Sequence, residues 1–362
     1  MKYYLMNKDV PLVEFCIETS KFGTEIITEE KTAGNVFGWF SDMEKWLEGR
    51  NYAKHKKHLK NYLNEWGMNT YSGFITMTKC LGLNDTLWVK RSDSNDCWNT
   101  VNLYDNNFND IAEQTAFEEG IGEIGFSGTS PEITSEGSFG KCWKKFDDGI
   151  FLIKKGSEDI GIEPYTEFFS SQIASKLCAK SVSYDLIDFK GHISTKCKSF
   201  TNEKYGFVPF YRFCDEKEIS KIIDFFQTPP YSQWYERFVE MIVLDSVIVN
   251  PDRHVGNFGF LIDNESFEIV DLAPIFDFNL SLEAFYDIDN VYEHIRKRDF
   301  GHALGGDFIQ VARILKNKRI ENVLKEMKNL RFDTNELCNT LSEAKISKME
   351  ELARCQIQLI LE

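Results

Sequence analysis

The hydrophobic pattern is strongest between residues 238 and 278, where one long apolar run is followed by two short ones. Residues 238–249 are apolar at most positions, which predicts a buried helix that ends before Pro251, because proline cannot continue a helix and restricts the residue before it. Residues 258–262 and 267–270 are short apolar runs typical of strands. The polar segment between the helix and the first strand is costly to desolvate unless something binds it. We therefore expect a functional loop there.

That loop reads Asn-Pro-Asp-Arg-His-Val-Gly-Asn over residues 250–257. Asp252 and Asn257 are five residues apart, and Asp277 follows at the end of a later apolar segment. In protein kinases a catalytic Asp precedes a metal-binding Asn by five residues, and a later Asp provides the second metal contact. Mg²⁺ needs only a few oxygen ligands besides the substrate phosphates. The spacing predicts phosphoryl transfer, with Asp252 as general base and with Asn257 and Asp277 as Mg²⁺ ligands.

A plain turn is the alternative interpretation of this loop. Asn-Pro-Asp by itself is typical of an ordinary turn, because Asn and Asp bond to their own backbone and Pro fixes φ. The longer pattern favours catalysis, since turn chemistry alone does not require the His, the second Asn or the distant Asp277.

Two sequence blocks carry a family resemblance. Asn-Pro-Asp-Arg-His-Val-Gly-Asn-Phe-Gly-Phe-Leu over residues 250–261, followed by Leu-Ala-Pro-Ile-Phe-Asp over 272–277, is similar to the core signature of HipA-like serine/threonine kinases. A looser likeness extends over residues 121–282. The resemblance implies an α+β, two-lobed protein-kinase-like fold with an N-terminal accessory module and a helical C-terminal lobe. It also implies ATP- and Mg²⁺-dependent phosphorylation of a protein Ser or Thr, often autophosphorylation, and in several members a toxin role opposed by an antitoxin partner.

Residues 149–154 read Gly-Ile-Phe-Leu-Ile-Lys and are similar to the kinase strand that brings a Lys to the phosphates of ATP. Lys154 is the candidate, and Lys155 points to the opposite face because side chains alternate along a strand. The alternative is a solvated lysine at a strand end. A helix is predicted from Glu163 onward, and either Glu163 or Glu167 would pair with Lys154, with Glu167 preferred. Ordinary helix-start chemistry is the alternative for both glutamates.

Residues 120–130 are rich in Gly and hydroxyl side chains, as a loop that covers phosphates should be. Gly125, Ser127 and Gly128 are the candidate nucleotide contacts, although such clusters also mark ordinary loops. HipA-like kinases often carry an autophosphorylated Ser three residues before a Gly of this region. Gly125 stands at that position here, which leaves Ser127 and Ser130 as nearby candidates.

The 362 residues exceed a typical single core, so we expect more than one packed unit. Residues 1–118 are predicted to form an accessory module that opens with a hairpin around Lys8. Residues 119–211 are predicted to form the kinase small lobe, which ends in a hairpin over 182–197. Residues 212–362 are predicted to form a mostly helical large lobe that carries the catalytic and metal-binding loops.

The net charge of −15 argues against direct nucleic-acid binding, which requires many phosphate-neutralising cations. A basic stretch over residues 50–60 is either a solvated helix face or a docking patch for an acidic partner or for DNA in a complex. The nine cysteines contain no CxxC pair and indicate reduced thiols, and the six histidines show no zinc-ligand spacing. No run is long enough to span a membrane and no signal sequence is evident, so we expect a cytoplasmic protein, although specialised export would leave no trace in the sequence.

Three functional hypotheses remain open. The first is a HipA-like Ser/Thr protein kinase that acts on a protein substrate. The second is a small-molecule kinase, because the catalytic residues do not specify whose hydroxyl is phosphorylated. The third is a nucleotide-binding regulator without appreciable transfer activity, although the presence of Asp252, Asn257 and Asp277 favours an enzyme.

Overall fold

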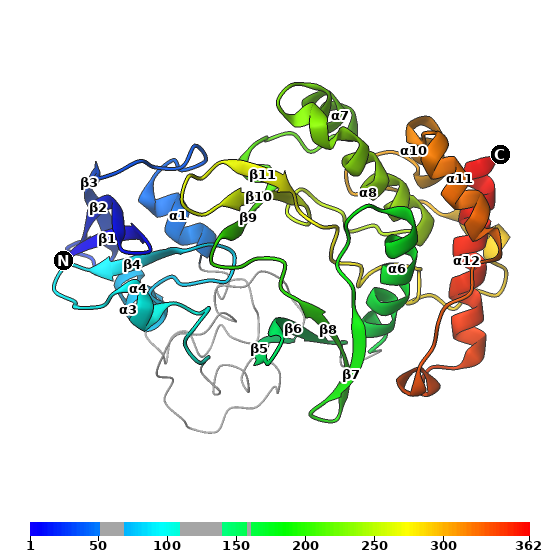
Figure 1. Ribbon diagram of the computed structural model, residues 1–362, viewed down its shortest axis with the longest axis horizontal. Helices are drawn as coiled ribbons and strands as arrows, with labels where there is room; N and C mark the ends of the chain where they lie inside the picture. Colours follow the sequence, from blue (N-terminus) through cyan, green and yellow to red (C-terminus); the bar gives the residue numbers. More distant parts are fainter. Residues whose placement is uncertain (51–68, 109–139, 158–160) are drawn as a thin grey trace. The chain divides into compact units, whose positions relative to one another are not determined.

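The computed structural model describes residues 1–50, 69–108, 140–157 and 161–362 (Figure 1). These residues form two compact units whose segments alternate along the sequence. The first unit comprises Met1–Ile153, Thr201–Phe207 and Leu261–Val270. The second comprises Lys154–Phe200, Val208–Phe260 and Asp271–Glu362. The loop over 250–257 therefore belongs to the second unit, as do the predicted site residues Lys154, Glu167 and Asp277.

The first unit contains a four-stranded sheet with the order β3-β2-β1-β4. Its strands are β1 (Lys2–Asn7), β2 (Val10–Thr19), β3 (Glu25–Thr32) and β4 (Leu87–Arg91). The central strand β1 pairs antiparallel with both neighbours, so that Leu5 lies opposite Val13 on one side and Val89 on the other. Lys8, with φ of 49°, makes the turn between β1 and β2. The hairpin expected around Lys8 is thus confirmed.

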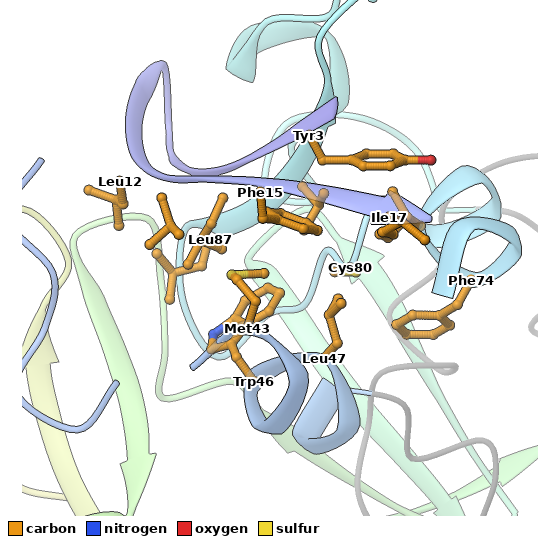
Figure 2. Close-up of a cluster of buried hydrophobic side chains, with 14 of the residues drawn as sticks. Tyr3, Leu12, Phe15, Ile17, Met43, Trp46, Leu47, Phe74, Cys80 and Leu87 are labelled. Carbon is orange, nitrogen blue, oxygen red and sulfur yellow. The ribbon is translucent and has the colours of Figure 1, made fainter. Parts of the chain in front are cut away.

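The core of the first unit lies between this sheet and two helices, α1 (Met43–Arg50) and α3 (Tyr71–Thr78). Figure 2 shows the buried side chains of the core, among them Phe15 from β2, Trp46 from α1 and Phe74 from α3. A second cluster gathers around Trp88, which is fully buried, and includes Trp98 of the short helix α4 (Trp98–Val101). Burial of these large apolar surfaces stabilises the unit.

Two further sheets contain strands that pass from one unit into the other. One has the order β5-β6-β8-β7 and the other the order β11-β10-β9. Their strands are β5 (Lys141–Phe146), β6 (Gly149–Lys155), β7 (Asp185–Phe189), β8 (His192–Lys198), β9 (Tyr205–Pro209), β10 (Gly259–Asp263) and β11 (Ile269–Leu272). β7 and β8 form an antiparallel hairpin around Gly191, as the pattern over 182–197 predicts.

Helices dominate the second unit. They are α6 (Glu163–Leu177), α7 (Ile219–Gln227), α8 (Tyr235–Ile248), α9 (Val291–Lys297), α10 (Phe308–Leu315), α11 (Lys318–Glu326) and α12 (Glu343–Leu361). Short 3-10 turns lie at η2 (Phe210–Arg212), η3 (Tyr231–Trp234), η4 (Met327–Asn329) and η5 (Glu336–Thr340). Helix α8 is buried from Phe238 onward, because it packs against α6, α10 and α12. An apolar surface on all sides requires such a central position.

The second predicted strand after the loop begins later than its sequence pattern indicates. Phe267 lies in a turn with φ of 60°, where its backbone N–H donates to the carbonyl of Asp263, and β11 starts only at Ile269. The ring of Phe267 instead packs against Phe37 and Trp39 in the first unit. Its hydrophobicity therefore reflects core packing and not strand pairing.

None of the helices in the described ranges combines the length and the apolar character that a membrane crossing requires.

Candidate functional site

The loop over 250–257 begins where helix α8 is stopped. Val249 adopts a left-handed conformation with φ of 51°, and the N–H of Asn250 donates to the carbonyl of Asp245. The buried Asn250 side chain then accepts from the N–H of Asp252 at 3.1 Å and donates to Asp245 Oδ1 at 3.1 Å. Asn-Pro-Asp thus forms a turn, and the turn fixes the backbone of Asp252. The turn and the catalytic interpretation of this segment are compatible.

Arg253 holds the loop from inside the protein. Its side chain is fully buried, with Nε 3.0 Å from Asp245 Oδ2. One of its terminal nitrogens donates both to the carbonyl of Asn257 at 2.7 Å and to that of Phe276 at 2.6 Å. Arg253 therefore joins the loop over 250–257 to the segment that carries Asp277. Burial raises the pKa of Asp245 and the guanidinium of Arg253 opposes that rise.

Asp252 and Asn257 are joined within the loop by one hydrogen bond. Asn257 Nδ2 donates to the backbone carbonyl of Asp252 at 2.9 Å, which fixes the orientation of the amide. Within the described part of the chain, no donor reaches Asn257 Oδ1 or the carboxylate of Asp252. Half-burial raises the pKa of Asp252, the charge of His254 lowers it and the carboxylate of Asp277 raises it further. The two carboxylates are therefore close enough to repel each other.

Lys154 lies between two carboxylates. Its Nζ is 2.6 Å from Glu167 Oε1 and 2.7 Å from Asp277 Oδ1. The hydroxyl of Thr195 donates to the second oxygen of Glu167 at 2.6 Å, so that both oxygens of this buried carboxylate are bonded. Of the two glutamates considered as partners of Lys154, Glu167 forms the ion pair in the structure. Glu163 instead accepts a hydrogen bond from the N–H of Ser157 at 3.0 Å.

Electrostatics keep Lys154 charged. Burial alone would lower the pKa of the ammonium, but the carboxylates of Asp277 and Glu167 outweigh this effect and hold the pKa well above its usual value. Burial raises the pKa of Glu167, and the ammonium of Lys154 opposes that rise. Lys154 and its two carboxylates carry a net negative charge together, so a phosphate would share the ammonium only where a cation offsets the carboxylate of Asp277.

Tyr184 completes the surroundings of Lys154 and was not predicted from the sequence. Its ring centroid is 5.8 Å from Lys154 Nζ, and its hydroxyl accepts from the backbone N–H of Asp277 at 3.0 Å. Burial raises the pKa of Tyr184 well above its usual value, so that the phenol stays neutral. Arg253 was likewise not given a role from the sequence, although Asp245 within an apolar helix signals a buried partner.

The oxygen donors of the site fit Mg²⁺. Asn257 and Asp277 offer a carboxamide and a carboxylate, which are hard ligands, and Mg²⁺ completes its shell with water and substrate phosphates. The mutual repulsion of Asp252 and Asp277 adds a reason for a cation to bind beside them. Among the described residues, no group of three or more His, Cys, Asp or Glu side chains forms a dedicated metal cage. The predicted nucleotide contacts Gly125, Ser127 and Gly128 lie outside the described residues.

The chain matches no protein-family model. It is similar to the serine/threonine-protein kinase CtkA of Helicobacter pylori, with 31% identity over 126 residues that cover 31% of this chain. The match spans 38% of the length of that relative. The crystal structure of the proinflammatory kinase CtkA of Helicobacter pylori superposes with a TM-score of 0.45 and 18% identity, over 62% of this chain and 93% of that one.

The HipA protein of Shewanella oneidensis, solved with HipB and operator DNA, aligns over 98% of this chain and 96% of its own, with a TM-score of 0.56 and 10% identity. The chain has the fold of HipA. The resemblance to HipA-like proteins that the two motif blocks indicate is confirmed for the fold. The expected α+β fold class is confirmed as well. At 10% identity the likeness to HipA concerns the fold, and the roles of individual residues rest on the geometry described above.

Proposed function

We propose that this chain is an ATP- and Mg²⁺-dependent kinase of the HipA-like type that phosphorylates Ser or Thr of a protein. The observation that carries the proposal is the assembly of Lys154, Glu167 and Asp277 within hydrogen-bonding distance. In kinases a Lys–Glu ion pair and a metal-binding Asp must be in place together for phosphoryl transfer. The sequence likeness to a serine/threonine kinase and the HipA-like fold support the same reaction.

In the proposed mechanism Lys154 binds the phosphates of ATP, and Glu167 holds its ammonium in place. Asp252 accepts the proton of the acceptor hydroxyl, whose oxygen forms the new bond to the γ-phosphorus while the bond to the bridging oxygen breaks and ADP leaves. Mg²⁺ held by Asn257 and Asp277 would neutralise the phosphate charge. Arg253 contacts no substrate in this scheme and keeps the two loops together.

We also propose roles for the parts of the chain, a partner and a location. Residues 119–211 would act as the small lobe and residues 212–362 as the large lobe, with residues 1–118 as the accessory module. The HipA structure contains HipB and operator DNA, which favours an antitoxin-like protein partner for this chain. We further propose autophosphorylation. A reducing, cytoplasmic location agrees with nine cysteines that form no disulfide.

Replacing Lys154 by Met should lower the rate of phosphoryl transfer by about 10²–10³-fold, because a preorganised charge on the phosphates is lost. The assay measures transfer of labelled phosphate from ATP to a general protein substrate such as casein and to the enzyme itself. Lys155→Met is the matched control, since the neighbouring lysine points to the other face of β6. Equal loss of transfer in both variants, with both folded, would contradict the role of Lys154.

The rate should also depend on pH through Asp252. A general base works only when ionised, so kcat/KM should fall as the pH drops through the pKa of Asp252. Because that pKa is raised, the fall should begin at a higher pH than an ordinary Asp gives. His254→Gln should move the fall to still higher pH, since the positive charge that lowers the pKa of Asp252 is removed. A pH profile that is identical in both proteins would count against Asp252 as the base.

A further inference from the structure

Asp277 sits in an unusual backbone conformation. Its φ is 65°, in the left-handed region, and Leu282 and Glu283 in the same segment also have positive φ, at 61° and 44°. For residues with a side chain this conformation is unfavourable by about 1 kcal/mol or more per residue. The surrounding structure must therefore hold the segment over 277–283 in place.

The hydroxyl of Tyr184 holds one end of this segment. It accepts from the backbone N–H of Asp277 at 3.0 Å, and the tyrosine is almost fully buried just before strand β7. The ring also packs edge to face against Phe278, with 5.8 Å between the centroids. Water cannot easily replace the tyrosine oxygen at a buried position, so its loss would leave the N–H of Asp277 without this acceptor.

Thr166 holds the segment two residues further on. Its hydroxyl lies 2.6 Å from the carbonyl of Asn279 and 2.8 Å from that of Glu163, so its single proton is shared between two acceptors. Thr166 is fully buried on helix α6 and directly precedes Glu167, the partner of Lys154. The helix that carries Glu167 is thereby bonded to the segment that carries Asp277.

We propose that Tyr184 and Thr166 are positioning residues, whose hydroxyls fix the backbone on both sides of Asp277 so that its carboxylate is aimed at the metal. This rests on the proposed function, in which Asp277 binds Mg²⁺. Lys154 approaches the same carboxylate at 2.7 Å, and the ring of Tyr184 faces Lys154, so one tyrosine contacts both the cationic and the metal-binding parts of the site. A metal ligand displaced by even a small shift of its backbone loses affinity.

Hydrogen exchange followed by mass spectrometry tests the backbone part without relying on activity. In the nucleotide-free protein, Tyr184→Phe and Thr166→Val should each speed exchange of peptides that cover residues 275–283 by about fivefold, as expected for one hydrogen bond of ordinary net strength. Thr166→Ser keeps the hydroxyl and should exchange like the wild type. Tyr165→Phe is the matched control, because the hydroxyl of this buried tyrosine on α6 contacts Thr340 and not the segment.

Calorimetric titration of Mg²⁺ into each protein with a non-hydrolysable ATP analogue tests the metal part. The half-saturating Mg²⁺ concentration should rise about fivefold in Tyr184→Phe and Thr166→Val, while Thr166→Ser and Tyr165→Phe match the wild type. The positioning role would be overturned if Tyr184→Phe exchanged at the wild-type rate, or if Tyr165→Phe exchanged as fast as Tyr184→Phe. It would also be overturned if Tyr184→Phe and Thr166→Val exchanged faster but bound Mg²⁺ with unaltered affinity. A wild-type protein that binds no Mg²⁺–nucleotide would refute the proposed function itself, a result that needs no variant.

Discussion

Replacing Asp252 by Asn is expected to lower the rate of phosphoryl transfer by about 10²–10⁴-fold, the usual contribution of a positioned general base. The backbone around residue 252 is fixed by Asn250 and by the amide of Asn257, so the asparagine would occupy the same place without the ability to take a proton. Affinity for ATP should stay that of the wild type, because Asp252 contacts the acceptor and not the nucleotide in this scheme. Single-turnover transfer from labelled ATP measures the first effect, and calorimetry the second.

Asp277→Asn should also reduce transfer strongly, because it lowers the affinity for Mg²⁺. A higher Mg²⁺ concentration should therefore partly restore the transfer rate of Asp277→Asn, whereas it should not restore that of Asp252→Asn. Asp185→Asn, an exposed position on β7, is the matched control and should behave as the wild type. If Asp252→Asn transferred phosphate at the wild-type rate, another group would have to be the base.

Replacing Arg253 by Met should destabilise the protein by about 3–5 kcal/mol, the typical cost of removing one partner of a buried ion pair. Asp245 would remain buried with its carboxylate uncompensated, and the carbonyls of Asn257 and Phe276 would lose their shared donor. Urea unfolding followed by circular dichroism measures the change. Lys297→Met removes the exposed lysine of the ion pair with Glu293 and should shift the free energy of unfolding by less than about 0.5 kcal/mol.

The double variant Arg253→Met with Asp245→Leu separates stability from function. An apolar pair of similar volume removes the unpaired charge and should recover much of the lost stability. Transfer should stay low, because no donor then ties the carbonyls of Asn257 and Phe276 together. Full recovery of both stability and transfer in the double variant would contradict the role of Arg253 in joining the two loops. If Arg253→Met alone were as stable as the wild type, the expected loss of about 3–5 kcal/mol would be contradicted.

The sequence predicted the main elements of the second unit because their patterns are local. The apolar run before Pro251 became helix α8, and the five-residue spacing of Asp252 and Asn257 follows from a short loop between a helix and a strand. Lys154 could be found in the same way, since four apolar residues precede it on one strand. In each of these cases the neighbouring residues along the chain are enough to predict the element or the site residue.

The contacts of Tyr184 and Thr166 could not be read from the sequence. Tyr184 reaches the N–H of Asp277 across 93 residues, and Thr166 reaches the carbonyl of Asn279 across 113. Buried Tyr and Thr side chains occur in many ordinary cores, so nothing local distinguishes these two. Phe267 shows the converse problem, because an aromatic residue that packs on Phe37 and Trp39 looks like part of a strand until its φ of 60° is known.

The central claim is that the chain transfers phosphate from ATP to Ser or Thr. Mass-spectrometric mapping of phosphorylated residues tests it most directly, after the wild-type protein has been incubated with ATP and Mg²⁺, alone and with a cell lysate, beside Asp252→Asn. The account predicts phosphoserine or phosphothreonine that depends on the wild-type protein and is absent with Asp252→Asn. The same phosphorylated residues in both samples, or none in either, would contradict it.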